Sequence, residues 1–461
     1  MDDEIVPSEI SKALDQIDRL RALIVDRYTG DNIQSNEPLG KDIADLRAAV
    51  DALDQAFQNE GKGPNGTEAT GKKTSRAKIR IRLFLLAASM IGLAYFFSNP
   101  HPWTYFDYTY RSARALVSGS LSLDEPPTSW MNEMIPFESH YYSAFPFGSV
   151  LTLVPVAVLQ KLHLIDEFPT MAVVGITAGC IALLLLLYSL QYEVSNFKRG
   201  VLTAAILFGT CMWCNLAFGG TWQLNLGFAV LGEIGALYFT RRGAPFLAGA
   251  FFALAFGNRT EIILLVPVFF YLLGGEIKKC FKFSIVPILL GLATLLYNDL
   301  RFHSPFDFGY ARIPGVLKEL RHGIFSIYAV PDNIKAMLLD FSWKVFSQYP
   351  YLVPHTFGGS IFLSSPFLVL IFRRGARDRK LKIAAWVAIT LLIVPLWLHG
   401  NPGGWQFSYR YMMILLPWIF VLLLESARPR VTLVESALFA VSILINAWAS
   451  YLFLWTGYVQ P

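Results

Sequence analysis

Residues 101–148 read HPWTYFDYTYRSARALVSGSLSLDEPPTSWMNEMIPFESHYYSAFPFG, a polar and aromatic stretch between apolar segments. The apolar run 83–98 (LFLLAASMIGLAYFFS) precedes it, and apolar sequence resumes at residue 149. Further apolar runs of membrane-spanning length recur through the rest of the chain. Only helices satisfy every backbone polar group inside lipid when the alternating pattern of a barrel is absent. The chain is therefore predicted to be an all-α polytopic membrane protein.

The amino-acid composition supports this fold class. Of the 461 residues, 54% are hydrophobic and 16% are charged, against about 25% charged residues in typical globular domains. Residues 1–60 carry 14 acidic and 6 basic residues, whereas the rest of the chain carries 20 acidic and 33 basic residues. Basic residues beside membrane helices anchor cytoplasmic loops, so this positive charge gives no reason to expect a nucleic acid partner.

The basic clusters also orient the predicted helices. Lys and Arg residues between positions 72 and 82 precede the first span and place the N-terminus in the cytoplasm. We predict 11 transmembrane helices, about 83–98, 170–191, 201–218, 225–240, 246–257, 260–274, 284–300, 357–372, 383–398, 411–424 and 432–456. The stretch 149–163 is predicted to be interfacial, because counting it as a span moves later basic clusters outside. The C-terminus is then periplasmic, and we expect a bacterial inner membrane.

Three regions follow from these patterns. Residues 1–60 hold two amphipathic helical repeats with a heptad seam, which predicts a cytoplasmic coiled-coil-like region for oligomerisation or a partner protein. Residues 61–82 are predicted to be a basic flexible linker. Residues 83–461 form the membrane domain, with two long outer loops at 99–168 and 301–356 that carry amphipathic helices on the outer face.

Acidic residues in the first outer loop are candidates for chemistry. Asp107 follows the first span at once, and a desolvated carboxylate there is suited to act as general base for a hydroxyl acceptor. The alternative is an N-cap of the helix predicted over 108–117. Glu133 and Glu138 could contact an acceptor or a divalent cation, although no metal-ligand spacing is present. Their alternative is a solvated loop position.

Two arginines are candidates for binding a phosphate. Arg259 interrupts an apolar hairpin within GNRTE, where its guanidinium could hold a phosphate or pair with Glu261 to close a tight turn. Arg410 lies at the head of a span between Tyr409 and Tyr411, and the same two interpretations apply to it.

Aromatic side chains and short motifs complete the inventory. Tyr142 and Tyr409 could contact a sugar, or they could anchor the protein at the membrane interface. Cys211 and Cys214 have CxxC spacing inside an apolar segment, which favours packing over redox chemistry. No nucleotide-binding loop, HExxH or GxSxG motif occurs in the sequence.

Five segments of the sequence resemble a known superfamily over about residues 83–425. They are FDYTYRSARALVSGSL, YYSAFPFGSVLTLVP, GNRTEIILLVP, YNDLRFHSPFDFGY and GGWQFSYRYMMILLP. In this order they resemble the GT-C superfamily of polyprenyl-phosphate-sugar-dependent glycosyltransferases, in particular bacterial relatives of the protein O-mannosyltransferases (glycosyltransferase family 39-like). The resemblance implies an inverting transfer from a lipid-linked sugar donor to a hydroxyl of a glycan, lipid or protein acceptor.

The resemblance also implies roles for individual residues. Asp107 would activate the acceptor, and Arg259 with Arg410 would hold the donor phosphate. Two departures stand out: Tyr108 replaces the second acid of the eukaryotic mannosyltransferases, and Phe145 stands where many relatives carry a lysine. His140 is a weak substitute for that lysine.

Two alternatives to a glycosyltransferase remain at this point. A flippase or transporter of lipid-linked sugars would also bind a polyprenyl phosphate, but it should place polar groups deep within its spans and often shows repeated halves. A catalytically silent GT-C-like scaffold would act through the N-terminal helices.

Overall fold

The computed structural model describes residues 68–102, 106–123, 133–320 and 322–459. The coiled-coil-like helices predicted for residues 1–60 lie outside these ranges and remain a prediction. Two compact units are distinguished, Met1–Leu83 and Phe84–Pro461. The second unit holds every element from α4 onward, and the description below concerns it.

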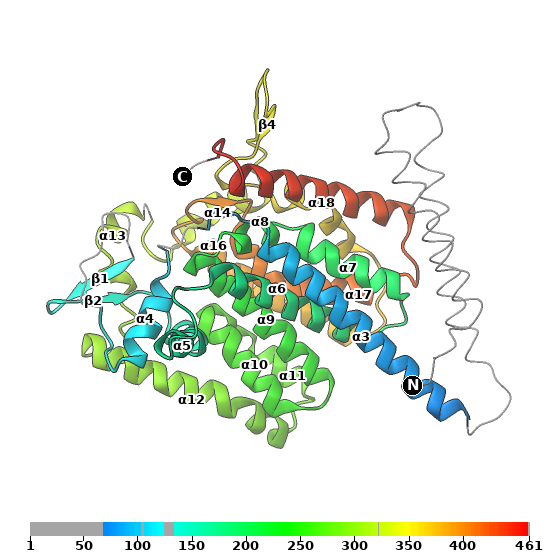
Figure 1. Ribbon diagram of the computed structural model, residues 1–461, viewed down its shortest axis with the longest axis horizontal. Helices are drawn as coiled ribbons and strands as arrows, with labels where there is room; N and C mark the ends of the chain where they lie inside the picture. The colour runs from blue at the N-terminus through cyan, green and yellow to red at the C-terminus, as the bar shows by residue number, and fades with distance from the viewer. Residues whose placement is uncertain (1–67, 103–105, 124–132, 321, 460–461) are drawn as a thin grey trace. The chain divides into compact units, whose positions relative to one another are not determined.

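Helices make up most of the described chain (Figure 1). The α-helices are α3 (Glu68–Phe96), α4 (Tyr108–Val117), α5 (Phe147–Lys161), α6 (Thr170–Ser189), α7 (Asn196–Phe208), α8 (Met212–Ala217), α9 (Thr221–Arg241), α10 (Pro245–Asn258), α11 (Val266–Leu272), α12 (Ile277–Phe302), α13 (Val316–Glu319), α14 (Val330–Ile334), α15 (Ile361–Ser364), α16 (Arg379–Leu398), α17 (Leu416–Glu425) and α18 (Leu433–Leu454). Short helical segments of other types are η1 (Thr260–Leu265), η2 (Tyr310–Arg312), η3 (Ile327–Ala329), η4 (Lys335–Leu339), η5 (Pro366–Phe372) and η6 (Arg410–Leu415).

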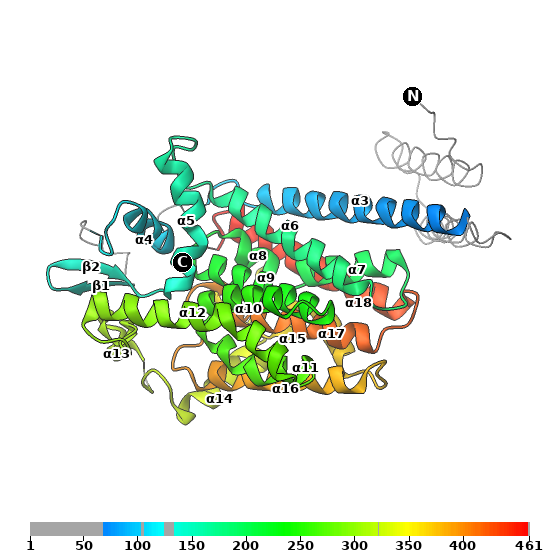
Figure 2. The ribbon, with the colours of Figure 1, turned by 90° about the horizontal axis from the view of Figure 1, so that it is seen from below.

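The strands are short and pair locally. The hairpin of β1 (Met134–Phe137) and β2 (His140–Ser143) is antiparallel, with Met134 opposite Ser143. A second antiparallel pair joins β3 (Lys344–Val345) to β4 (Leu352–Val353), and β5 (Phe357–Gly358) pairs in parallel with β6 (Gln406–Phe407). Both ribbon views place β1, β2 and α4 at one end of the helical bundle (Figures 1 and 2).

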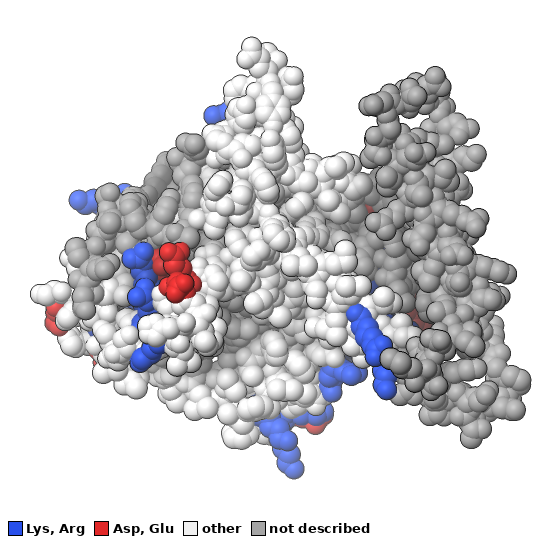
Figure 3. Space-filling model, viewed as in Figure 1, with Lys and Arg blue, Asp and Glu red and all other residues white. Residues whose placement is uncertain are grey.

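Five helices in the described part of the chain are long and apolar enough to cross a membrane. They are Lys78–Phe96, Thr170–Ser189, Ile277–Phe302, Arg379–Leu398 and Leu433–Leu454. Each overlaps a predicted span, so the membrane-protein class is supported, whereas the count of 11 spans is not confirmed. Figure 3 shows that Lys, Arg, Asp and Glu cover only a small part of the described surface on the face shown.

Two of the predicted spans are not continuous helices, because the chain interrupts each of them locally. The predicted helix 201–218 is broken, because α7 ends at Phe208 and α8 begins at Met212. The predicted helix 357–372 consists of strand β5, the single turn α15 and the 3-10 segment η5. Pro366 begins η5, and a proline cannot donate the backbone hydrogen bond that would continue a helix. Apolar composition alone did not reveal these breaks.

Two further segments were predicted from the sequence near the first span. The stretch 149–163 is helical, as α5, and its 15 residues are short for a span. The predicted flexible linker 61–82 is partly wrong, because α3 already begins at Glu68. From Glu68 onward this segment is rich in Lys, Arg and Ala, which are good helix formers, and no proline occurs between residues 68 and 82.

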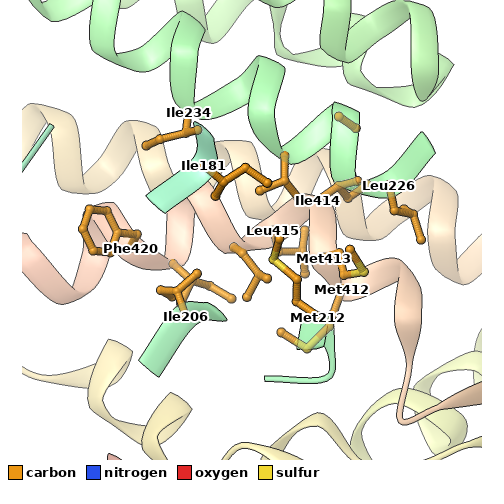
Figure 4. Close-up of a cluster of buried hydrophobic side chains, with 14 of the residues drawn as sticks. Ile181, Ile206, Met212, Leu226, Ile234, Met412, Met413, Ile414, Leu415 and Phe420 are labelled. Atoms are coloured by element: carbon orange, nitrogen blue, oxygen red, sulfur yellow. The ribbon is translucent and has the colours of Figure 1, made fainter. Parts of the chain in front are cut away.

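The core is formed by helices that are far apart in the sequence. Figure 4 shows Ile181 of α6, Ile206 of α7 and Met212 of α8 gathered around Ile414 and Leu415 of η6. All five side chains are at most 2% exposed. Tyr95 of α3 joins the same core and donates a hydrogen bond to the carbonyl of Leu207.

Two glycines bring α5 and α10 into close contact. A Cβ atom added to Gly148 would lie 2.3 Å from the Cα of Gly257, so no larger residue fits without backbone movement. Gly257 is followed by Asn258 and Arg259 at the end of α10. This contact therefore fixes the end of α10 against the start of α5.

Candidate active site

A cavity of about 1190 Å³ opens near the ends of several helices. Its wall is formed by segments that are far apart in the chain: Phe106, residues 133 and 144–146, Phe218 with the start of α9, the junction of α10 and η1, the end of α12, residues of the region 308–325, and the region 395–411. The charged residues in the wall are Glu133, Arg259, Glu261, Arg301 and Arg410. The cavity thus brings together groups separated by up to 277 positions in the sequence.

Arg259 and Arg410 flank the same aromatic ring in this cavity. The guanidinium carbon of Arg259 lies 5.0 Å from the centroid of the Tyr411 ring, and that of Arg410 lies 5.2 Å from it. Arg259 also pairs with Glu261, with its Nη2 atom 2.6 Å from Oε1. The ion pair expected as the alternative for Arg259 is therefore present, and Arg259 still lines the cavity.

Arg410 makes longer and therefore weaker hydrogen bonds than Arg259 does. Its side chain is buried, and its Nε atom has no hydrogen-bond acceptor among the described residues. Its other contacts are long: 3.5 Å from Nη1 to the Trp405 carbonyl and 3.4 Å from Nη2 to the Tyr411 hydroxyl. Because Arg410 lines the cavity and its two Nη atoms make only these long contacts, its guanidinium is suited to donate to an anion there.

Glu133 supplies a carboxylate to the same cavity. Trp222, from the first turn of α9, donates a hydrogen bond of 2.6 Å from its indole nitrogen to Oε1 of Glu133. Phe106 and Phe145 pack against that indole. Burial raises the pKa of Glu133 to about 7, while the bond from Trp222 and the charges of Arg410 and Arg259 act in the opposite direction. Glu133 can therefore exchange a proton near neutral pH.

Three amides line another part of the wall. Gln223 and Asn225 lie in the first turns of α9, and Asn258 ends α10. Each is at most 5% exposed, and each has a side-chain carbonyl oxygen without a hydrogen-bond donor among the described residues. The three residues therefore line the wall with their amide oxygens buried away from the open space of the cavity.

Asp107 does not line this cavity. Its carboxylate accepts a hydrogen bond of 2.5 Å from Nε of Arg111, one turn along α4. The helix predicted over 108–117 is present as α4, but the Asp107 side chain makes no capping hydrogen bond to it. Burial raises the pKa of Asp107, and Arg111 partly opposes that shift. The preceding residue, Phe106, does reach the cavity wall.

The other candidates also lie outside the cavity wall. Glu138 is 3.0 Å from the imidazole of His303 at the exposed tip of the β1–β2 hairpin, and His140 is exposed in the same hairpin. Tyr142 packs against Phe302. Tyr409 is buried, with its hydroxyl 3.3 Å from the carbonyl of Leu396, which indicates a structural role.

Arg301 and His399 were not singled out as site residues in the sequence, yet both line the cavity. Arg301 is buried, stacks on Tyr297 at 3.9 Å and donates to the carbonyl of Ser143, so it does not extend toward the membrane surface. Burial lowers the pKa of His399, and Arg259 acts in the same direction. His399 is therefore neutral at pH 7.

Metal ligands and cysteines complete the description. Within the described ranges, no group of three or more His, Cys, Asp or Glu side chains is arranged to hold a metal ion. Cys211 and Cys214 are free thiols packed in the core, as their apolar context predicted.

Comparison of the chain with protein-family models, with curated proteins and with solved structures finds no match.

Proposed function

We propose that this protein is a membrane glycosyltransferase of the GT-C kind, which transfers a sugar from a polyprenyl phosphate to an acceptor hydroxyl in the cavity described above. The observation that carries the proposal is the presence, in the wall of one cavity, of an arginine whose Nη atoms make only long contacts and of a carboxylate whose pKa is about 7. In this proposal, Arg410 binds the donor phosphate and Glu133 accepts the proton of the acceptor hydroxyl. The cavity faces the periplasm in this proposal, and the N-terminus lies in the cytoplasm.

In the proposed reaction, Arg410 and Arg259 bind the phosphate of the donor. Guanidinium groups bind phosphate oxygens through charge-assisted and often bidentate hydrogen bonds. The Nη atoms of Arg410 make only contacts of 3.5 Å and 3.4 Å, whereas Arg259 already pairs with Glu261 at 2.6 Å. Arg410 is therefore the main phosphate ligand. Arg259, which also lies over the Tyr411 ring, adds positive charge nearby.

Glu133 acts as the general base in the proposed transfer step. The acceptor oxygen bonds to the anomeric carbon as the bond from that carbon to the phosphate oxygen breaks, and the acceptor proton passes to Glu133. The electron pair of the broken bond leaves with the lipid phosphate, where the arginines stabilise it. The resemblance to GT-C enzymes supports inversion at the anomeric carbon.

The lipid chain can reach the cavity from the side. Ile263 and Leu264 of η1 line the cavity and are 44% and 40% exposed on the surface of the protein. Ile324 and Leu396 add apolar surface within the same wall. A polyprenyl chain could therefore lie along these residues while its phosphate reaches Arg410.

The assignment of the proton acceptor differs from the expectation drawn from the sequence. Asp107 is the position that the family resemblance favours, but its carboxylate is paired with Arg111 and does not line the cavity. Glu133 is preferred here because it lies in the same wall as the two arginines.

The decisive experiment compares Glu133→Gln with Asp107→Asn. The full-length protein is placed in lipid nanodiscs with polyprenyl-phosphate sugars, and sugar transfer to candidate acceptors is measured. We expect Glu133→Gln to lower kcat by about 10²- to 10⁴-fold, the usual contribution of a general base. Glu138→Gln is the matched control, because Glu138 is exposed and outside the cavity.

Each result of this comparison has a clear meaning. A full rate in folded Glu133→Gln together with a large loss in Asp107→Asn would transfer the role of the base to Asp107. Full rates in both variants would rule out a carboxylate base at either position. Absence of transfer in the wild-type protein from every polyprenyl-phosphate sugar would contradict the glycosyltransferase proposal.

A carrier of lipid-linked sugars is the second candidate, and one observation favours it. Glu233 is fully buried in the middle of α9 and accepts a hydrogen bond of 2.8 Å from the indole of Trp418. Acidic groups deep within a helical membrane bundle are rare, and in transporters they mark substrate, ion or proton pathways. Movement of the sugar lipid across a vesicle membrane without transfer would favour this candidate.

A further inference from the structure

The β3–β4 hairpin, within residues 341–353, has no role in the function proposed above. The sequence of this segment is FSWKVFSQYPYLV, and Lys344 is its only charged residue. Figure 1 shows the hairpin, drawn in yellow and labelled β4, projecting from the helical bundle crosswise to α18. The amide nitrogen of Phe346 donates to the carbonyl of Tyr351 at 2.8 Å and closes the turn between the two strands. The segment is therefore a defined hairpin that extends beyond the bundle.

Most of the large side chains of this hairpin are exposed. Their exposed fractions lie between 39% and 80%, and the residues are Phe341, Val345, Phe346, Tyr349, Tyr351 and Leu352. Large apolar side chains in water forgo the stabilisation that burial gives, and contiguous exposed apolar patches mark interaction sites. The hairpin is therefore suited to a partner of apolar character.

The hairpin is attached to the C-terminal part of α18. The indole nitrogen of Trp448 donates to the carbonyl of Leu352 at 2.8 Å, and the hydroxyl of Tyr349 donates to that of Tyr451 at 3.1 Å. The rings of Tyr349 and Trp448 also pack edge to face, with their centroids 6.1 Å apart. Because α18 is long and apolar enough to cross a membrane, the hairpin lies at the level of one end of a membrane-spanning helix.

The exposed face of α18 changes in character toward the hairpin. Val441 and Leu444 are exposed in the middle of the helix, whereas Tyr451 and Trp455 are exposed at its end. Aliphatic side chains suit the hydrocarbon core of a bilayer, and Trp and Tyr gather at its interface with water. The exposed aromatic side chains of the hairpin continue this aromatic end of α18.

The polar groups of the hairpin define how deep it can lie. Two paired strands leave backbone groups on their outer edges, and such open edges do not occur among lipid tails. Ser347 and Gln348 are exposed in the turn, where water or lipid headgroups can bond to them. The stem of Lys344 can lie along apolar surface while its ammonium group reaches a lipid phosphate. These groups suit the headgroup layer and the adjacent ends of the acyl chains.

We propose that the β3–β4 hairpin is an interfacial anchor, which lies in the headgroup layer of the bilayer beside the C-terminal end of α18. Lipid covers its exposed aromatic and aliphatic side chains. A second copy of the chain, or another protein, is the alternative occupant that the experiment must exclude. The inference goes beyond the proposed function, because it applies equally to a transferase and to a carrier.

Quenching of a fluorescent label tests this location in lipid nanodiscs. The full-length protein carries Cys180→Ala and Cys280→Ala, which leaves only the two buried thiols, and a single label is attached through Ser347→Cys in the turn of the hairpin. The quenchers are lipids with a spin label on the headgroup, and iodide in the water. Ser139→Cys, at the exposed tip of the β1–β2 hairpin, is the matched control. We expect the lipid quencher to act more strongly than iodide at position 347, and the reverse order at position 139.

A second variant tests which side chains hold the hairpin in the lipid. Val345→Ser combined with Phe346→Ser removes two exposed apolar groups and leaves the bonds of Tyr349 and Leu352 to α18 in place. We expect this variant to lose quenching by the lipid at position 347 and to gain quenching by iodide, with an unchanged unfolding midpoint.

Three results would overturn the proposal. The first is equal iodide quenching of the labels at positions 347 and 139 in the otherwise unchanged hairpin. The second is protection of the label at position 347 from both quenchers, which would show that protein covers the hairpin. The third is the same lipid quenching with and without the two serine substitutions.

Discussion

The indole nitrogen of Trp222 donates a hydrogen bond of 2.6 Å to the carboxylate of Glu133. The bond connects the first turn of α9 to the residue that precedes the β1–β2 hairpin, 89 positions away. It favours the ionised carboxylate, whereas burial among aromatic side chains disfavours it, and the pKa of Glu133 is about 7 as a result. A glutamate in this balance changes its charge within the physiological pH range.

Activity should therefore depend on pH through Glu133. The ionised form accepts the proton, so kcat/KM should fall as pH decreases through about 7 and reach a plateau above about 8. The measurement is a pH profile of sugar transfer between pH 5.5 and 9. A profile that is flat across this range would contradict the role of Glu133.

Trp222→Phe should move that profile to higher pH. The substitution removes the hydrogen bond that stabilises the ionised carboxylate, so the pKa of Glu133 rises. A hydrogen bond to a charged group contributes about 1.5–3 kcal/mol, which corresponds to about 1 to 2 pH units. Trp213→Phe, which removes a bond to Ser98 outside the cavity, is the matched control and should leave the midpoint unchanged.

Arg410→Gln should weaken binding of the donor phosphate. The lost charge-assisted bonds predict roughly 10- to 100-fold weaker binding of polyprenyl phosphate, measured by titration in nanodiscs. Arg312→Gln is the control, since Arg312 pairs with Asp307 and lies outside the cavity wall. Equal affinity of the Arg410→Gln and wild-type proteins would remove Arg410 from the phosphate site.

The sequence identified the membrane class and several local features. Apolar runs predicted the five long helices, the residues 108–117 were predicted to be helical, and the spacing of Arg259 and Glu261 allowed for their ion pair. Each of these features depends on residues close together in the chain. Local periodicity and local charge were therefore sufficient.

The cavity itself could not be read from the sequence. Glu133, Trp222 and Arg410 come together only because α9 packs against η6 and its first turn is bonded to the residue before β1. Hydropathy does not show which helices are neighbours. Asp107 was preferred because it follows the first span, but its pairing with Arg111 depends on the course of α4. The amides of α9 and α10 are ordinary polar residues until tertiary packing buries them.

Gly148→Ala should destabilise the protein and disturb the cavity. The added methyl group would lie 2.3 Å from the Cα atom of Gly257, so α5 and α10 must separate. Overpacking of this kind costs about 1–3 kcal/mol and displaces the adjacent Asn258 and Arg259. The measurements are the thermal unfolding midpoint and the affinity for a polyprenyl-phosphate sugar. Gly291→Ala in α12 is the control, because nothing lies within 4 Å of its added Cβ atom.

The buried ion pair of Lys198 in α7 and Glu435 in α18 should be essential for stability. The two side chains are 0% and 2% exposed, their charged atoms are 2.9 Å apart, and Arg373 also contacts Glu435. Glu435→Gln leaves the buried lysine without its counter-charge and should cost about 3–5 kcal/mol, seen as a lower unfolding midpoint. Adding Lys198→Met should restore most of that loss. Glu276→Gln, in an exposed pair with Lys279, should not shift the midpoint. Similar midpoints for Glu435→Gln and wild type would show that the pair contributes nothing to holding α7 against α18.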